Sequence, residues 1–256
     1  DYPVHYIQKK FETAYRSIVD DIKKHAPRTQ RCIFILDQYG WSKVPFWVIN
    51  DIFDRLTDAE IILTFTPDQI IDYASGDNQK AVRLQKALDS VGLNLETRDI
   101  SDILNSANHP DKWMLRVAAQ ELLSNTMKQQ LNSKFFTRYY IRNTKTHRHL
   151  MLVHLSHHQT AHNEMMEEHW TNSNIHLNHQ GYAGVSPLIL GFDGKKEGEF
   201  EIFSDSFFQD REEKVVTILS DQIPIILSVH PLGLPFNVLM GMLRNEAPIT
   251  ESIVKK

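Results

Sequence analysis

With 256 residues, 41% of them hydrophobic, the chain is long enough for one large domain, or one domain with a small appendage, around a real apolar core. Its formal net charge of −4 argues against a protein that coats nucleic acid by bulk electrostatics, although a local basic patch would still fit. The single cysteine excludes a disulfide framework, and no apolar stretch has the length of a membrane span, so we expect a soluble cytoplasmic protein without membrane contact.

The first quarter of the chain alternates between strand-like and helix-like patterns. Residues 4–7 are β-prone, and apolar side chains recur at helical spacing over 11–24. Residues 32–36 form an uninterrupted apolar run, which is typical of a strand covered on both faces. Residues 44–56 predict a second helix, and residues 60–65 predict another buried strand. This order predicts an α/β fold with a parallel sheet.

The middle of the chain predicts helices. Residues 67–73 are expected to form one or two helical turns, and 79–91 and 113–131 have the spacing of amphipathic helices. A polar stretch joins the last two. We interpret residues 74–132 as a helical insertion or lid rather than as core.

Two further strands are predicted at 138–142 and 150–155, joined by a short polar connection that suits an antiparallel hairpin. A helix is expected from about residue 159 to residue 169. Together with the earlier elements this predicts a mixed sheet that ends in an antiparallel hairpin, an arrangement similar to that of Rossmann-like methyltransferases.

The composition changes after residue 172, and helices are predicted at 207–219, at 232–244 and from 251 onward. We therefore expect one α/β domain over 1–172 and a mainly helical region over 173–256, with a truncated winged helix as one interpretation of the latter. The chain begins without methionine and ends in what reads as a cut helix, so we also expect residues to be missing at both ends, including part of the first domain.

The clearest candidate site is Asp37-Gln38-Tyr39-Gly40-Trp41, which follows the first long apolar run. A carboxylate at the carboxyl end of a buried strand lies where open α/β sheets bind ligands. Gly40 permits a turn, and Tyr39 and Trp41 offer flat faces on which a planar base could stack. The alternative is a simple turn, in which Asp37 caps a helix and the aromatic rings pack on the sheet.

Several stretches resemble the three-Cys-motif partner family. They are Ile35-Leu36-Asp37-Gln38-Tyr39-Gly40-Trp41, then Val44-Pro45, then Ala59-Glu60-Ile61-Ile62-Leu63-Thr64-Phe65, and the hairpin with His154-Leu155-Ser156-His157-His158. The resemblance covers roughly residues 4–170. It implies a methyltransferase-like domain that uses S-adenosylmethionine and is encoded beside a three-cysteine-motif protein in mobile or phage-defence loci.

The resemblance also implies roles for the candidate site. By analogy with amino-methyltransferases, Asp37 would accept hydrogen bonds from the amine to be methylated, and Tyr39 would stack on the base. Gly40 and Trp41 would complete the catalytic site. Gln38 stands where a proline is expected, which frees a backbone N–H and is expected to loosen the turn.

The cofactor side departs further from the family pattern, because its glycine-rich loop is absent from the 256 residues. Gln8, at the end of the first predicted strand, stands where an acidic residue would hold the ribose of the cofactor, and its amide is a weaker partner than a carboxylate. Two functions therefore remain open. One is a methyltransferase acting on nucleic acid or protein, and the other is a decayed fold that binds nucleic acid or a three-Cys-motif protein.

The histidine-rich stretch offers a third interpretation. His158 and His162 have the i, i+4 spacing of zinc proteases, but Gln159 stands where the glutamate base is needed, so we predict no metal site there and keep a metal-dependent nuclease or hydrolase only as an alternative. Surface and helix-cap histidines are the simpler interpretation. His157, which follows a strand end, is the histidine most worth following.

Basic side chains gather near the predicted hairpin, where they would either contact nucleic-acid phosphates or simply solvate an edge strand. They are Lys134, Arg138, Arg142, Lys145 and Arg148.

Overall fold

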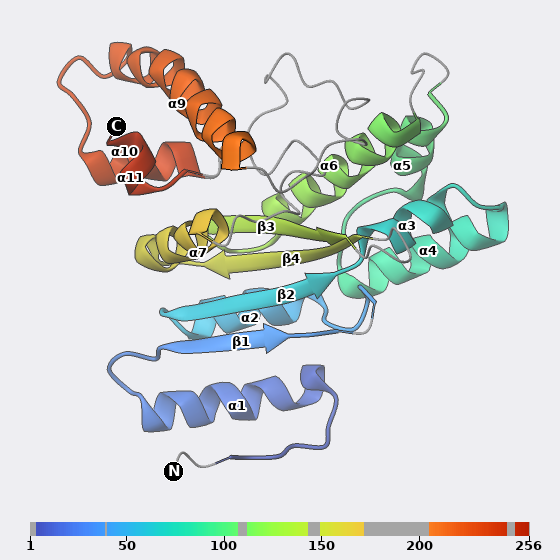
Figure 1. Cartoon of the computed structure of the whole chain (residues 1–256). Coiled ribbons are helices and arrows are strands. Elements are labelled where there is room, and N and C mark those ends of the chain that lie inside the picture. Colours follow the sequence, from blue (N-terminus) through green and yellow to red (C-terminus); the bar gives the residue numbers. More distant parts are fainter. Residues whose placement is uncertain are drawn as a thin grey trace.

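The computed structural model describes residues 4–38, 40–106, 112–142, 149–171, 205–244 and 249–255. In these segments, helices pack around a four-stranded sheet, and further helices follow at the C-terminal end (Figure 1). In chain order the elements are α1 (Phe11–His25), β1 (Cys32–Leu36), α2 (Phe46–Arg55), β2 (Ala59–Phe65), α3 (Pro67–Ala74), α4 (Asn78–Val91), α5 (Thr97–Leu104), α6 (Lys112–Gln130), β3 (Phe135–Arg142), β4 (His149–Ser156), α7 (Gln159–Thr171), α9 (Asp205–Ser228), α10 (Phe236–Arg244) and α11 (Glu251–Val254).

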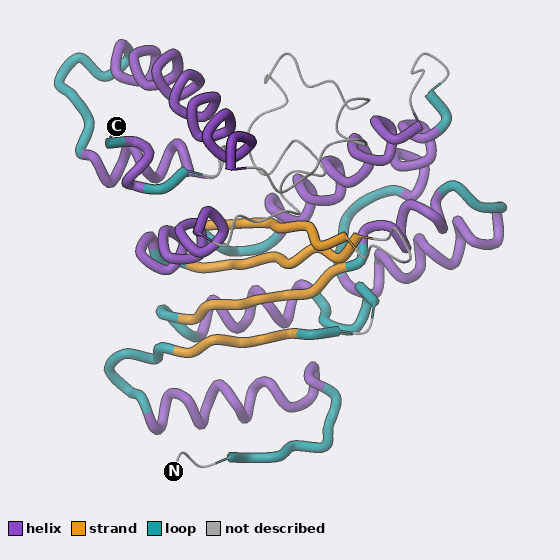
Figure 2. The backbone as a smooth tube through the Cα atoms, in the orientation of Figure 1, coloured by secondary structure: helices purple, strands orange, loops and turns teal. Residues whose placement is uncertain are grey.

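The strands lie in the order β1-β2-β4-β3, with β1 parallel to β2. Strand β4 lies between β2 and β3 and is antiparallel to both, so β2 and β3 run in the same direction. This confirms the predicted α/β class and the mixed sheet with its antiparallel hairpin. Figure 2 shows the four strands side by side.

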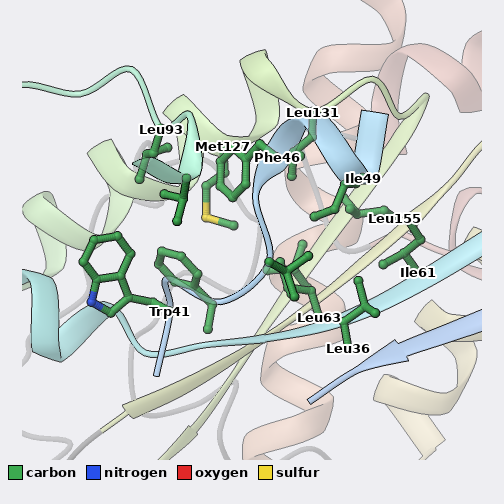
Figure 3. Close-up of a cluster of buried hydrophobic side chains, with 14 of the residues drawn as sticks. Leu36, Trp41, Phe46, Ile49, Ile61, Leu63, Leu93, Met127, Leu131 and Leu155 are labelled. Atoms are coloured by element: carbon green, nitrogen blue, oxygen red, sulfur yellow. The ribbon is translucent and has the colours of Figure 1, made fainter. Parts of the chain in front are cut away.

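One face of the sheet forms the main core. Side chains at alternate positions of β2, among them Ile61, Leu63 and Phe65, are fully buried there, because successive residues of a strand point to opposite faces. Helix α2 contributes Ile49, and Figure 3 shows Ile49 with the strand residues in one cluster. The same cluster includes side chains from α4, α5 and α6 (Leu84, Leu88, Val91, Ile100, Ala119, Leu123 and Met127).

The helical segment predicted as an insertion or lid is therefore helical but packs as part of the core. Its helix α5 was not predicted, because eight residues are too few to establish a period against polar neighbours. Helix α7 covers the opposite face of the sheet over β3 and β4, where His162 stacks on Phe135 with ring centroids 5.0 Å apart.

Two predictions about the start of the sheet are wrong. Residues 4–7 form no strand, and Val4 and Tyr6 are almost fully exposed. Strand β1 is not covered on both faces either, because Ile33 and Ile35 are exposed on the face opposite the core. Both errors have one cause: apolar composition indicates a strand, but only the neighbouring elements decide whether the strand is paired and covered.

The C-terminal helices have an apolar cluster of their own, formed by side chains of α9, α10 and α11 (Val215, Leu219, Leu239, Met240, Leu243, Ile249 and Ile253). The backbone N–H of Glu251 donates to Asn163 Oδ1 of α7 at 3.1 Å, which ties α11 to the α/β part. The described parts of the predicted region 173–256 are helical, whereas residues 173–204 lie outside the described residues and the truncated winged helix stays a prediction. None of the helices in the described segments combines the length and the apolar composition needed to cross a lipid bilayer.

Candidate functional site

The carboxyl ends of β1 and β2 lie together because the two strands are parallel and in register, with Leu36 opposite Leu63. Asp37 follows β1 directly and is exposed, as predicted for a carboxylate at this end of the sheet. The hydroxyl of Thr64 on β2 lies 3.0 Å from Asp37 Oδ1. This carboxylate oxygen is closer to the hydroxyl than the carbonyl oxygens of Leu36 and Gln38 are. The neighbouring strand thus orients an acidic side chain that stays open to solvent.

Gln38 holds the loop after β1 rather than loosening it. Its side chain is buried, and its Nε2 donates to the carbonyl oxygen of Thr64 at 3.0 Å. Its Oε1 accepts from the backbone N–H groups of Lys43 and Val44 at 2.8 and 3.1 Å. The N–H that a proline would lack donates to Thr64 Oγ1 at 3.0 Å. The predicted loosening is therefore wrong, because the amide supplies more hydrogen bonds than a proline ring would.

Gly40 and Trp41 shape the far side of this loop. Gly40 has φ of +92°, a conformation that L side chains rarely adopt, and a Cβ added there would lie 3.4 Å from Gln69 Oε1. Trp41 is only 8% exposed, and its ring meets the edge of Phe65 with centroids 6.3 Å apart. Figure 3 shows Trp41 at the border of the core cluster. Its packing matches the simple-turn alternative, and its predicted contact with a ligand stays a prediction.

The other two predicted site residues are placed less directly. Tyr39 lies outside the described residues. Gln8 is exposed in the segment just before α1 and follows no strand, so the predicted strand-end position is wrong. Figure 1 shows that α1 begins at the end of the sheet where β1 finishes.

A buried carboxylate at this end of the sheet was not predicted. Asp68, in the first turn of α3, accepts from Arg116 Nη2 at 3.2 Å and from Gln120 Nε2 at 3.1 Å, both on α6. Arg116 Nη1 also donates to Asp72 at 3.0 Å. Burial alone would lower the pKa of Arg116, but the two carboxylates outweigh burial and raise it. This group fastens α6 to α3 beside the candidate site, and no sequence signal joins residues so far apart.

The histidines have separate environments. His158 Nε2 contacts Asp58, whereas the ring of His162 is buried against Phe135, with its Nδ1 2.8 Å from Thr137 Oγ1. In these contacts the two imidazoles meet different side chains, Asp58 and Thr137, despite their i, i+4 spacing. In the described part of the chain, no three His, Cys, Asp or Glu side chains lie close enough together to hold a metal ion.

His157 and His154 also contact protein groups. His157 Nε2 lies 2.7 Å from the carbonyl oxygen of Asn132, and its ring stacks on Phe53 with centroids 4.6 Å apart. His154 is buried on β4 with its Nε2 3.2 Å from Glu60 Oε2. Burial lowers the pKa of His154, although the hydrogen bond and charge of Glu60 act in the opposite direction.

Two further reactive or charged groups are held in the structure. Burial, with the nearby Glu60 and Asp58 charges, raises the pKa of the Cys32 thiol to about 11, so this thiol stays protonated near neutral pH. On β3, Arg138 is 12% exposed in its side chain and donates to both oxygens of Glu121 at 2.6 and 2.8 Å. Arg138 thus joins β3 to Glu121 of α6. Of the other predicted phosphate contacts, Lys145 and Arg148 lie outside the described residues.

The protein was also compared with known proteins. No family model matches the chain, and neither a curated protein nor a solved structure is significantly similar to it.

Proposed function

We propose that this chain is a methyltransferase-like α/β protein in which Asp37 binds the amine of a substrate. The observation that carries the proposal is the exposed carboxylate at the carboxyl end of β1, oriented by Thr64 from the parallel neighbour β2. Open α/β sheets bind ligands at this edge. The order β1-β2-β4-β3, with an antiparallel strand between two strands of common direction, supports the Rossmann-like methyltransferase part of the proposal.

Asp37 has the chemistry for this role. An exposed carboxylate accepts hydrogen bonds from an amine N–H and orients the nitrogen lone pair toward an incoming methyl group. The hydroxyl of Thr64 takes one carboxylate oxygen, Oδ1, and leaves Oδ2 for the substrate. The buried amide of Gln38 fixes the backbone on which the carboxylate stands. A planar nucleic-acid base with an exocyclic amine, stacked on Tyr39, is the substrate class that the family resemblance adds.

The methyl donor in this proposal has no support from the structure of the chain. S-adenosylmethionine would supply an activated methyl group, but Gln8 does not end a strand, and the chain has no glycine-rich loop of the expected kind. The described residues therefore do not fit a cofactor cradle, and S-adenosylmethionine binding rests on the resemblance alone. This observation favours a second candidate function, in which the same end of the sheet recognises a base, or a three-Cys-motif protein, without methyl transfer.

Two measurements separate these functions. The first is calorimetric titration of the full chain with S-adenosylmethionine; binding at micromolar concentration is expected for an enzyme, and no binding would remove methyl transfer from the proposal. The second is affinity for a single-stranded oligonucleotide, with Asp37→Asn compared with Asp20→Asn, which alters an exposed carboxylate on α1.

If Asp37 binds the substrate amine, Asp37→Asn lowers oligonucleotide affinity about tenfold or more, because the amide cannot reproduce a charge-assisted hydrogen bond. In an active enzyme the same variant slows transfer of a radiolabelled methyl group by about a hundredfold through lost positioning. Asp20→Asn changes neither quantity. Equal binding by both variants would contradict the role of Asp37.

A further inference from the structure

The outer edge of β1 is open. Within the described residues β1 pairs only with β2, and the N–H of Cys32 donates to the carbonyl oxygen of Asp58 at the start of that ladder. In a parallel ladder the backbone groups of alternate residues point to opposite sides of the strand. Since Cys32 faces β2, Ile33 and Ile35 direct their N–H and C=O groups to the open side. In the described segments, the backbone N–H and C=O groups of these two residues have no partner on a neighbouring strand.

The side chains at this edge are also uncovered. Ile33 is 61% exposed and Ile35 is 71% exposed, on the face of the sheet opposite the main core. Parallel strands normally have both faces covered, and exposed edges normally carry charges, prolines or bulges that prevent pairing. The five residues of β1 include none of these protective features. Open backbone groups and uncovered isoleucines thus coincide on one strand.

Helix α1 flanks the same edge from the core face. The Phe11 ring of α1 meets Phe34 of β1 with centroids 6.3 Å apart, and Tyr15 donates to Asp51 of α2 at 2.7 Å. Figure 1 shows α1 lying along β1 on the side away from β2, so the helix extends past the edge of the sheet. A second copy that paired edge to edge would bring its own α1 into this space. An extended segment without a helix on that face would fit.

The charges near the edge indicate the composition of its occupant. Helix α1 ends beside the start of β1, and its last turn is basic, with Lys23 and Lys24. Arg28 and Arg31 follow in the connection to β1, and no acidic residue lies between 22 and 31. Lys24, Arg28 and Arg31 are exposed, and Lys23 is partly buried. A segment with acidic residues at this end is therefore favoured electrostatically.

We propose that the outer edge of β1 is a docking site for an extended segment of a partner polypeptide. The segment adds a strand to β1, covers Ile33 and Ile35 with its own apolar side chains, and places acidic residues beside Arg28 and Arg31. Backbone hydrogen bonds supply affinity, and alternate side chains supply specificity. The site does not depend on the proposed methyl transfer, because Asp37 lies beyond the end of the strand.

The probes are two synthetic peptides of about ten residues, the length of a typical strand-adding segment. Each alternates valine and threonine, with a pair of glutamates at the amino end in one and at the carboxyl end in the other, which suit parallel and antiparallel addition. Backbone hydrogen exchange of the full chain is measured with and without each peptide. We expect one peptide to protect the amides of Ile33 and Ile35, and a version with prolines in place of the threonines to protect neither.

Variants make the test specific. Ile35→Lys should weaken peptide binding about tenfold or more without changing the unfolding midpoint, because the side chain is exposed. The matched control is Val82→Lys, which changes an exposed apolar side chain on α4 and should leave binding unchanged. The proposal is overturned if neither peptide protects these amides, or if Ile35→Lys binds as tightly as the parent chain. It is also overturned if the free chain is a dimer in which both amides are already protected.

Discussion

The side-chain amide of Gln38 determines the shape of the loop that follows β1. It is buried, and it satisfies one carbonyl of β2 and two N–H groups of its own loop at the same time. Buried backbone groups without hydrogen-bond partners destabilise the fold. The amide of Gln38 supplies the hydrogen bonds that water would supply in an exposed turn. Asp37 next to it is exposed, and its carboxylate accepts a hydrogen bond from the Thr64 hydroxyl.

Replacing Gln38 by alanine should lower the free energy of unfolding by about 2–3 kcal/mol, because buried groups such as the Thr64 carbonyl lose their partners. Urea denaturation followed by circular dichroism measures the change. The control is Gln79→Ala, at an exposed position of α4, which should shift stability by less than about 0.5 kcal/mol. Equal losses in the two variants would show that the loop does not need the amide.

Among the helices, the clearest backbone requirement lies at the end of α4. Gly92 has φ of +76° and closes the helix with its N–H on the carbonyl oxygens of Leu88 and Asp89. Gly241 lies inside α10, where a helical residue needs no such conformation. Both glycines have open space around the position of a Cβ. The two sites therefore differ in backbone conformation and not in room.

The same substitution should have opposite effects at these sites. Gly92→Ala should cost about 1–2 kcal/mol of unfolding free energy, because an L side chain is strained in the left-handed region. Gly241→Ala should add about 0.5–1 kcal/mol, because it lowers the entropy of the unfolded chain. Thermal and urea unfolding of both variants against the parent provide the test. A gain at Gly92 or a loss at Gly241 would contradict the assigned conformations.

The folded protein as a whole brings together titratable groups that lie far apart in the sequence. His154 on β4 meets Glu60 on β2 across the sheet, and in the described segments its Nδ1 is buried without a hydrogen-bond partner. Burial lowers its pKa in the folded state below the ordinary value of 6.5. The unfolded chain therefore takes up a proton at a pH where the folded chain does not.

The stability contributed by neutral His154 is present above the ordinary pKa and is lost as pH falls from about 6.5 toward the lowered folded pKa. One proton bound only in the unfolded state gives a slope of at most about 1.4 kcal/mol per pH unit. Urea denaturation from about pH 8 to about pH 5 should show this loss, and His154→Gln should flatten it. The same slope in the variant would place the responsible group elsewhere.

The packing of the molecule also explains which predictions succeeded. Helices α1, α2 and α4 lie within a few residues of their predicted bounds, because their apolar residues repeat with the helical period. Helices α6 and α7 also lie within a few residues of their predicted bounds, although their apolar residues follow that period only weakly. The strands of the hairpin were found by their apolar content and short polar connection. The position of Asp37 followed from a single rule, that a residue after a buried strand lies at the edge of the sheet.

The sequence by itself determined the α/β class, the antiparallel hairpin and an acidic residue at the end of β1, since each depends on a local pattern of side chains. Tertiary structure alone decided that residues 4–7 stay unpaired, that β1 has an open edge, that Trp41 packs in the core and that Gln38 tightens its loop. Pairing and burial depend on neighbours that are distant along the chain, and no local period encodes them.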